Sequence, residues 1–173
     1  MKTATALALA AVLSAAGPAF AAAPPPTKPV AASFYSGRWY EIARIPNAGQ
    51  RDCEAPSTQF VGAGASFAVT QVCRKGSASG AAKTFNTKGR ILPSTNNAKF
   101  EMSFLGGIKK QEYWVLDTAG DGSWAIMATP GGNYIWLLSR KAVMSESAKA
   151  AAVGRIRALG YRQTLEFPAQ PPK

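Results

Sequence analysis

Turn-forming residues divide this chain into short segments at near-regular intervals, and this spacing limits the possible folds more than any other feature. Glycine, proline, asparagine and serine dominate the dividing stretches VGAGA, GSASGA, PSTNN, LGGIKK, DTAGDGS and TPGGN. Eight apolar or alternating segments lie around them, at residues 37–45, 57–62, 66–74, 82–92, 98–104, 111–117, 123–128 and 133–140. This pattern predicts an all-β protein, an eight-stranded antiparallel up-and-down β-barrel whose closure leaves no sheet edge unpaired.

One segment, SESAKAAAVGRIRALG at 145–160, has the pattern of an α-helix. Ser145 or Ser147 is its N-cap, and Gly160 ends it. We expect its apolar face to pack on the outside of the barrel. That face comprises Ala148, Ala152, Val153, Ile156 and Leu159. A last short strand is predicted at 163–167.

The chain has two cysteines, Cys53 and Cys73. A hairpin between segments 57–62 and 66–74, centred on Ala63, places the two cysteines directly opposite each other, since each lies ten residues from Ala63. Directly opposed residues of an antiparallel pair are close enough for a disulfide. An isolated cysteine pair in an exported protein also favours a disulfide, which we therefore predict.

The N-terminal residues have the pattern of a secretory signal peptide. Lys2 precedes an apolar stretch rich in alanine and leucine, and small residues favour cleavage after Ala21 or Ala23. A membrane anchor is disfavoured because the apolar run is short and alanine is weakly hydrophobic. No cysteine lies near the cleavage region, which excludes a lipid anchor there. The predicted organisation is a signal peptide at 1–21, an extended Pro/Ala-rich tether outside the core at 22–35, a barrel domain at 36–167 and a tail at 168–173.

Charge and composition exclude several function classes. The chain has a formal charge of +11, of which the signal peptide holds only Lys2, so the mature chain carries +10. This charge favours contact with anionic ligands and with an anionic membrane surface. Nucleic acid is disfavoured because the basic residues are scattered. The chain has no histidine and only nine dispersed acidic residues. We therefore predict no catalytic residues, no metal site and no cofactor.

Three motifs resemble the signatures of the lipocalin family. GRWYEIAR at 37–44 is similar to the first signature, VLDTAGDGSWAIM at 115–127 to the middle one, and YIWLLSR at 134–140 to the last. The resemblance covers about residues 34–167 and is greatest to the bacterial and apolipoprotein D-like branch. It implies that Trp39 plugs the closed end of the barrel, that Arg140 lies across the Trp39 ring, and that Asp117 ends a strand. Gly37 would let the chain turn tightly beneath the barrel.

The resemblance also implies a ligand-binding barrel interior. If Trp39 points inward, Glu41 and Ala43 point inward as well. The predicted interior residues are Glu41, Thr58, Phe60, Tyr113, Tyr134, Trp136 and Leu138. On the sixth strand either Tyr113 or its neighbour Trp114 points inward, and any of these aromatic residues could instead be plain core. Glu41 either pairs with a tyrosine hydroxyl or an arginine, or recognises the polar group of a ligand.

The implied function is to carry or scavenge a small hydrophobic ligand, a fatty acid or lysophospholipid, in the bacterial cell envelope. An anionic head group would meet basic residues at the open end, for which the candidates are Arg44, Arg51, Arg74, Lys75, Lys109 and Lys110. The alternatives are a barrel filled by its own side chains and, less favoured, a lipid-modifying enzyme. We expect an exported periplasmic or secreted protein, monomeric or weakly dimeric.

Overall fold

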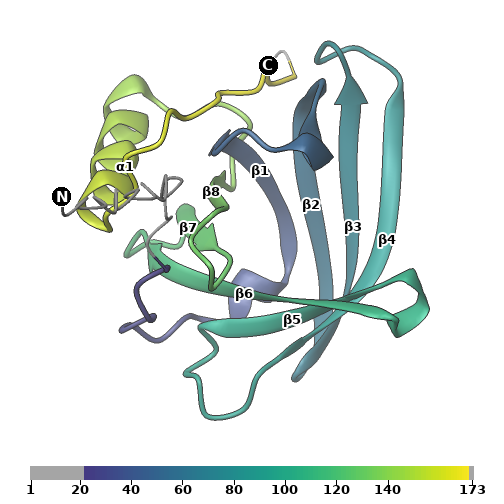
Figure 1. Ribbon diagram of the computed structural model, residues 1–173, viewed down its shortest axis with the longest axis vertical. Helices are drawn as coiled ribbons and strands as arrows, with labels where there is room; N and C mark the ends of the chain where they lie inside the picture. Colours follow the sequence, from purple (N-terminus) through teal and green to yellow (C-terminus); the bar gives the residue numbers. More distant parts are fainter. Residues whose placement is uncertain (1–21, 172–173) are drawn as a thin grey trace, which may run out of the picture.

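Eight antiparallel strands close into one barrel in the computed structural model, which describes residues 22–171 (Figure 1). Each strand pairs with the next along the chain, and the last pairs with the first. The strands are β1 (Gly37–Arg44), β2 (Cys53–Ala63), β3 (Ser66–Lys75), β4 (Ala82–Ile91), β5 (Lys99–Phe104), β6 (Lys109–Thr118), β7 (Trp124–Ala128) and β8 (Ile135–Ser139). Short 3-10 turns are η1 (Ala32–Tyr35), η2 (Ala48–Gln50) and η3 (Leu105–Gly107). The predicted up-and-down barrel is confirmed.

The up-and-down order places the links between strands alternately at two ends of the barrel. The links 45–52, 76–81, 105–108 and 129–134 surround one end, which we call the open end. The β2–β3, β4–β5 and β6–β7 turns lie at the other, the closed end, where β1 begins. Residues near the end of β1 therefore lie near the open end, and Trp39 near the start of β1 lies near the closed end.

The helix α1 (Glu146–Ala158) packs on the outside of the barrel, as predicted (Figure 1). The Ser145 hydroxyl accepts a hydrogen bond from the backbone N–H of Ala148 at 3.2 Å, so Ser145 is the N-cap. Ala152 and Ile156 are fully buried against the barrel wall. The buried residues here form the outer cluster: Ala23, Ile42, Ala43, Ile45, Leu116, Ile126, Ala128, Ile135, Leu137, Ala152, Ile156, Tyr161 and Leu165.

A second core fills the closed end of the barrel. This closed-end cluster comprises Val30, Phe34, Tyr35, Trp39, Phe60, Phe67, Val69, Ala98, Phe100, Met102, Val115, Ala125 and Leu138. Its aromatic rings pack at tilted and edge-on angles; the Phe60 and Phe67 centroids are 5.4 Å apart at 83°. Such edge-to-face contacts stabilise aromatic pairs beyond their buried area.

The prediction that residues 22–35 form a tether outside the core is wrong. Val30, Phe34 and Tyr35 are buried, and the Phe34 carbonyl accepts a hydrogen bond from the Trp39 indole N–H at 2.8 Å. The segment's three largest apolar side chains complete the closed-end cluster, which outweighs the tendency of its prolines to keep it extended. We call residues 23–35 the strap. The predicted signal peptide, residues 1–21, lies outside the described residues.

The strap runs from the outer cluster, at Ala23, to the closed-end cluster, at Tyr35, and is held at several points. The backbone N–H of Ala23 donates to the Pro130 carbonyl at 3.0 Å, and Lys28 Nζ lies 2.8 Å from Asp117 Oδ1. Asp117 also accepts a hydrogen bond from Arg155 of α1 at 2.8 Å. Burial tends to raise the pKa of Asp117, but the hydrogen bonds and charges of Lys28 and Arg155 outweigh it and hold the pKa below its usual value. Asp117 therefore joins the strap to the helix.

The disulfide between Cys53 and Cys73 is present, with Cα atoms 5.3 Å apart, but the predicted hairpin register is wrong. Cys53 is paired with Lys75, and the register shifts between Glu54 and Ser57 at a β-bulge. The turn falls at residues 64–65 rather than around residue 63, because Gly64, at φ +66°, is the residue that takes up the tight turn. The bond thus joins residues that are near neighbours, and not direct partners, across the two strands.

The predicted strand at 163–167 is reduced to one isolated bridge between Arg44 and Glu166. In the closed barrel each of the eight strands is hydrogen-bonded to a strand on both sides. This segment therefore finds only a short stretch of β1 with free backbone groups. The described part of the tail also contacts the barrel. The Ala169 carbonyl accepts from the N–H of Ala55 at 2.7 Å, and Gln170 Nε2 donates to the Glu41 carbonyl at 2.7 Å.

Candidate functional site

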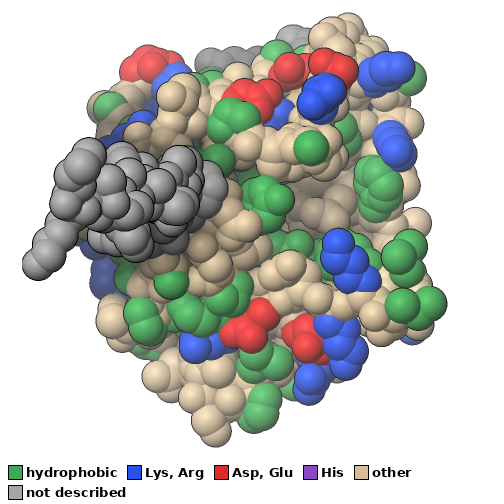
Figure 2. Space-filling view, in the orientation of Figure 1, with side chains coloured by type: hydrophobic (Ala, Val, Ile, Leu, Met, Phe, Trp, Pro, Cys, Tyr) green, Lys and Arg blue, Asp and Glu red, His purple; other side chains and the backbone are tan. Residues whose placement is uncertain are grey.

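A cavity of about 1300 Å³ opens at the open end of the barrel, and Figure 2 shows this face hollowed near its centre. All eight strands contribute lining residues, as do the links 45–52 and 129–134. The volume is above the range of about 300–1,000 Å³ that is usual for small-molecule pockets. The barrel therefore has room for a ligand beyond the side chains that fill its closed end.

The floor of the cavity is apolar and aromatic. It is formed by Phe60, Phe100, Met102, Tyr113 and Leu138, most of which also belong to the closed-end cluster. The rings of Phe100 and Tyr113 stack with centroids 5.4 Å apart. Burial raises the pKa of Tyr113 to about 12, so its hydroxyl stays protonated at neutral pH and can donate a hydrogen bond. Methionine and flat rings suit an alkyl chain, because they offer large contact area with few polar atoms.

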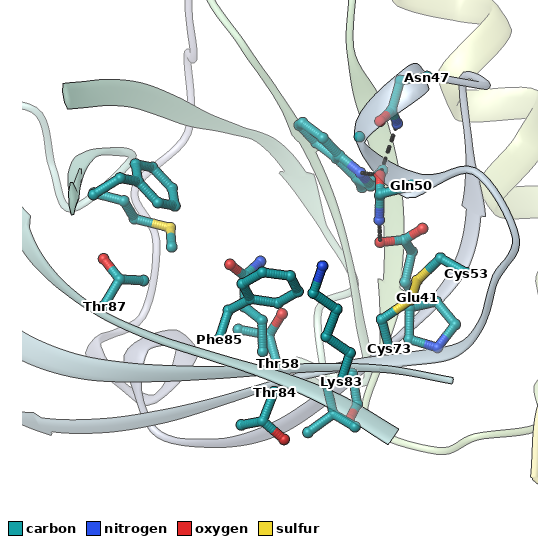
Figure 3. A pocket seen from close by; sticks show the side chains of 18 of the residues that line it. Glu41, Asn47, Gln50, Cys53, Thr58, Cys73, Lys83, Thr84, Phe85 and Thr87 are labelled. Carbon is teal, nitrogen blue, oxygen red and sulfur yellow. Dashed lines mark hydrogen bonds between the residues drawn. A yellow bond between two sulfur atoms is a disulfide. The ribbon is translucent and has the colours of Figure 1, made fainter. Parts of the chain in front are cut away.

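One wall of the cavity carries a hydrogen-bonded network centred on Gln50 (Figure 3). Gln50 Nε2 donates to Glu41 Oε2 at 2.8 Å, and Gln50 Oε1 accepts from the Trp136 indole N–H at 2.9 Å. Asn47 Nδ2 also donates to Gln50 Oε1, at 2.7 Å. Gln50 comes from η2 in the link after β1, whereas Trp136 lies on β8. The network therefore fastens this rim of the open end to the barrel wall.

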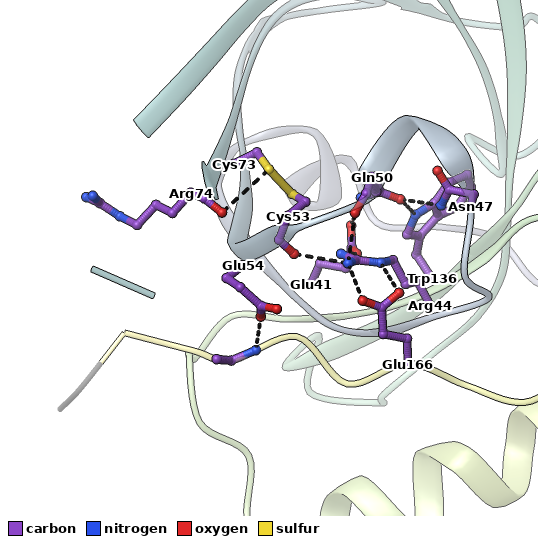
Figure 4. Close-up of a disulfide and its surroundings, with 11 residues drawn as sticks. Glu41, Arg44, Asn47, Gln50, Cys53, Glu54, Cys73, Arg74, Trp136 and Glu166 are labelled. Carbon is purple, nitrogen blue, oxygen red and sulfur yellow. Dashed lines mark hydrogen bonds and ion pairs between the residues drawn. A yellow bond between two sulfur atoms is a disulfide. The ribbon is translucent and has the colours of Figure 1, made fainter. Parts of the chain in front are cut away.

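Glu41 pairs with an arginine, which was one of the two possibilities open from the sequence (Figure 4). Arg44 Nη1 lies 2.8 Å from Glu41 Oε1, and Arg44 Nη2 lies 2.8 Å from Glu166 Oε1. Arg44 is fully buried and also donates to the Cys53 carbonyl at 3.0 Å. Burial raises the pKa of Glu41, while its hydrogen bonds from Arg44 and Gln50 act in the opposite direction. Both carboxylate oxygens are engaged, so Glu41 organises the wall.

The predicted inward position of Ala43 is wrong. The pairing of β1 with β8 shifts by one residue between Glu41 and Ala43. A bulge of this kind interrupts the alternation of faces along a strand. Ala43 consequently packs in the outer cluster under α1, while Glu41 stays in the cavity wall.

Basic side chains surround the mouth of the cavity. Arg51, Lys75, Lys83 and Lys109 line it, and three of these are among the basic residues expected there. Lys83 is the addition: Figure 3 shows it pointing into the cavity, where its Nζ lies 4.8 Å from the centre of the Phe85 ring. The period-two alternation of β4 could have revealed it, because Lys83, Phe85 and Thr87 share the inward face.

The other three expected basic residues do not line the mouth. Arg44 forms buried ion pairs with Glu41 and Glu166 and is not free to contact a ligand. Arg74 turns to the β3–β4 link, where it donates to the Gly80 carbonyl at 3.0 Å. Lys110 lies 3.4 Å from Glu101 on the outer surface. In each case a nearer acceptor holds the side chain away from the cavity.

The structure places all seven predicted interior residues on the cavity lining: Glu41, Thr58, Phe60, Tyr113, Tyr134, Trp136 and Leu138. Tyr134 lies just before β8 at the mouth and is partly exposed. Between the two candidates of β6, Tyr113 faces inward and Trp114 packs against the outer cluster. The sequence reasoning missed Gln50, Phe85, Phe100, Met102 and Met127. The alternation of residues 98–104 could have indicated Phe100 and Met102 on β5. Gln50 lies in a loop, where no sequence pattern indicates that it lines a cavity.

The closed end carries the contact expected between the first and last strand signatures. The guanidinium of Arg140 lies over the Trp39 ring and donates to the Ser36 carbonyl at 2.7 Å and the Ser33 carbonyl at 2.6 Å. Gly37 has φ +71°, and a Cβ there would come within 3.3 Å of Arg140 Nη1. The backbone angle therefore favours glycine at this position, and a Cβ would also crowd the Arg140 guanidinium.

In residues 22–171, no three acidic, cysteine or histidine side chains come together as a metal site would need. None of the helices in this part of the chain has the length and apolar character to cross a bilayer.

Residues 30–170 match the family model of the lipocalin-like domain, which spans most of the chain. The chain belongs to the lipocalin family. Lipocalins typically act as carriers of small hydrophobic ligands and not as enzymes, which supports ligand binding in this general sense. The bacterial and apolipoprotein D-like branch stays a prediction.

Solved structures similar to this lipocalin share its fold at low sequence identity. Insecticyanin from the tobacco hornworm Manduca sexta is 19% identical, with a TM-score of 0.66 over 83% of this chain and 82% of that one. Lobster apocrustacyanin A1 is 13% identical, with a TM-score of 0.63 over 82% and 80%. The cockroach allergen Per a 4 is 16% identical, with a TM-score of 0.61 over 82% and 88%. A search of curated proteins found no match to the sequence.

Proposed function

We propose that this lipocalin binds and carries or scavenges an amphipathic molecule with one alkyl tail and an anionic head, a fatty acid or lysophospholipid. The observation that carries the proposal is one cavity with an apolar floor and a basic mouth. An alkyl tail would lie against Phe60, Phe100 and Met102, from which water is excluded. The head would lie near Lys83 and Lys109, where charge attraction and solvent are both available.

The lining favours non-covalent binding over catalysis. Glu41 lines the cavity, but Arg44 and Gln50 occupy its two oxygens. The lining cysteines, Cys53 and Cys73, are bonded to each other and offer no thiolate. A general base and an activated nucleophile within reach of each other are the usual requirement for acyl or ester chemistry. The described residues of this lining do not supply that pair.

The setting that we propose is the bacterial cell envelope, with the protein exported to the periplasm or secreted, as a monomer or weak homodimer. The disulfide supports export, because disulfides persist in oxidising compartments. A ligand carrier in that compartment would collect fatty acids or lysophospholipids released from membranes.

Native mass spectrometry tests the proposal. The protein is purified from an oxidising compartment without detergent, and co-purifying molecules are extracted and identified. We expect a fatty acid or lysophospholipid at near one-to-one stoichiometry. A protein that carries nothing and also shows no fluorescence response to added lipid would instead support a barrel without a physiological ligand. A bound lipid that is chemically converted on incubation would support the enzyme alternative.

A matched pair of ligands tests the role of the charged head. Lauric acid and lauryl alcohol share a twelve-carbon tail, but only the acid is anionic at neutral pH. Trp136 lies on the cavity wall, so its fluorescence should respond to either ligand. We expect the acid to bind about tenfold more tightly, which corresponds to about 1.4 kcal/mol. Equal affinities would show that the basic mouth does not recognise the head group. Binding of the alkyl tail in the apolar cavity would still stand.

A further inference from the structure

Large apolar side chains are exposed around the mouth of the cavity. Among the described residues, seven large hydrophobic side chains are exposed, and four of them lie at the open end: Phe85, Leu105, Ile108 and Tyr134. Leu105 is 74% exposed and Ile108 is 89% exposed, the two highest values of the seven. Both lie in the link between β5 and β6, residues 105–108. Exposed apolar side chains grouped in this way mark an interaction surface.

The chain turns tightly between these two exposed side chains. Gly106 and Gly107 both have positive φ, +67° and +103°, and form the tight turn between them. Leu105 reaches the cavity mouth, whereas Ile108 lines no part of the cavity. A turn that only needed to be solvated would carry polar residues at these two positions. We call residues 105–108 the hairpin tip.

Basic side chains accompany the hairpin tip. Lys109 follows Ile108 directly and lines the mouth together with Arg51, Lys75 and Lys83. The hairpin tip reaches the right edge of the molecule in Figure 1, and Figure 2 shows apolar side chains there with basic ones nearby. The chain as a whole has a formal charge of +11. This combination of apolar tip and basic surround is complementary to a lipid surface with anionic head groups.

We propose that the open end of the barrel docks on an anionic lipid bilayer through the hairpin tip. Leu105 and Ile108 enter the boundary between head groups and acyl chains, and Lys109, Lys83 and Lys75 contact the phosphates. Docking in this orientation turns the cavity mouth toward the membrane, so a lipid can pass between bilayer and cavity with little exposure of its tail to water. This inference goes beyond the proposed function, because it concerns a surface and not the bound ligand.

Vesicle co-sedimentation tests the docking surface. The full protein is mixed with vesicles of phosphatidylcholine containing phosphatidylglycerol, and with vesicles of phosphatidylcholine alone. We expect binding to the anionic vesicles that weakens as salt is raised. Ile108→Ser should lower the partition coefficient by about tenfold. Val61→Ser is the matched control: Val61 is 65% exposed on β2, away from the open end, and its substitution should change binding less than twofold.

The outcomes separate docking from ligand binding. Ile108 does not line the cavity, so Ile108→Ser should leave fluorescence titration with soluble lauric acid unchanged. Equal effects of the Ile108 and Val61 substitutions, or no binding of the wild-type protein to anionic vesicles, would overturn the docking surface. A dimer in solution that Ile108→Ser dissociates, with no vesicle binding, would assign the hairpin tip to a second copy instead and would also overturn it.

Discussion

The guanidinium carbon of Arg140 lies 3.7 Å from the centroid of the Trp39 ring. Arg140 follows β8, whereas Trp39 lies near the start of β1, so the contact joins the two strands that close the barrel. The same guanidinium donates to carbonyls of Ser33 and Ser36, which precede β1. One side chain thus connects the strap, the first strand and the last.

Arg140→Ala should destabilise the protein by about 2–4 kcal/mol, since it removes the cation–π contact and leaves backbone carbonyls without their donor. Urea denaturation measures the loss. Arg140→Lys should recover only part of it, because an ammonium cannot reproduce the planar fork. Arg38→Ala on the exposed face of β1 is the control and should change stability by less than about 0.5 kcal/mol. Equal losses for the two arginines would contradict the role of Arg140.

Trp39→Ala should cost about 3–5 kcal/mol of stability, because it removes a large side chain that is almost fully buried in the closed-end cluster. Urea denaturation again measures the effect. A loss below about 1 kcal/mol would mean that Trp39 does not plug the barrel.

Gly89→Ala should destabilise the barrel by about 1–3 kcal/mol, because a Cβ at this position would lie 2.2 Å from Cε2 of the Phe67 ring. Phe67 is packed in the closed-end cluster and has little freedom to move. Phe67→Leu should reduce the cost of Gly89→Ala, which a double-mutant cycle measures. Gly154→Ala in α1 is the comparison. A Cβ there would have no atom within 4 Å, and the change should stabilise the protein by about 0.5–1 kcal/mol. Additive effects of the Gly89 and Phe67 changes would contradict the contact.

Asp117→Asn should lower stability at pH 7 by about 1–2 kcal/mol, a modest figure because Lys28 and Arg155 are each about half exposed. The pKa of Asp117 is lower in the folded chain, so its carboxylate contributes stability above the pKa of the unfolded chain. That contribution is lost as the pH falls through the folded pKa. The difference between wild type and variant should therefore shrink below about pH 4. Thermal unfolding across pH measures it, and a constant difference would contradict the ion pairs.

Replacing Cys53 and Cys73 with serine should destabilise the protein by about 3 kcal/mol. This is the free energy expected when a bond across 20 residues no longer restricts the unfolded chain. Peptide mapping without reductant should first find one linked pair. Two free thiols in protein from an oxidising compartment would refute the bond.

Lys83→Glu should weaken lauric acid binding by about fivefold or more, because it replaces a cation that points into the cavity by an anion. Lys88→Glu is the matched control on the same strand, since Lys88 lies on the opposite face of β4 and does not line the cavity. Fluorescence titration without vesicles measures both. Equal weakening by the two variants would indicate an effect of net charge alone.

The sequence was sufficient for the barrel, the helix and the disulfide, because each leaves a local signal. Turn residues separate the strands, Ser145 and Gly160 bound the helix, and the chain has only two cysteines to pair. Register was less predictable. The β2–β3 turn falls at residues 64–65 rather than around residue 63, and bulges at Glu54–Ser57 and Glu41–Ala43 shift the pairing again without a clear mark in the sequence. Counting residues from an assumed turn along an unbroken strand therefore gives the wrong partners.

Contacts between segments that lie far apart in the chain could not be predicted from the sequence either. The proline-rich composition of residues 22–35 indicated a tether, yet Phe34 and Tyr35 at its end complete the closed-end cluster. The sequence predicts Arg44 among the basic residues that meet a ligand, but Arg44 pairs with Glu166, 122 residues away. Alternation correctly indicated which side chains face the cavity, but which basic residues remain unpaired depends on the whole fold.

The strap also bears on the order in which the chain folds. It is synthesised before the barrel, yet its Lys28 pairs with Asp117, 89 residues later, and its Ala23 pairs with Pro130. The end of the strap packs on β1–β3, but its first part, residues 23–28, lacks these two partners until β6 and the β7–β8 link have formed. Contacts of such long sequence separation form slowly, because a large loop must close before they contribute. The first described segment of the chain is thus expected to dock last, and hydrogen exchange during refolding should find its amides protected after those of the barrel.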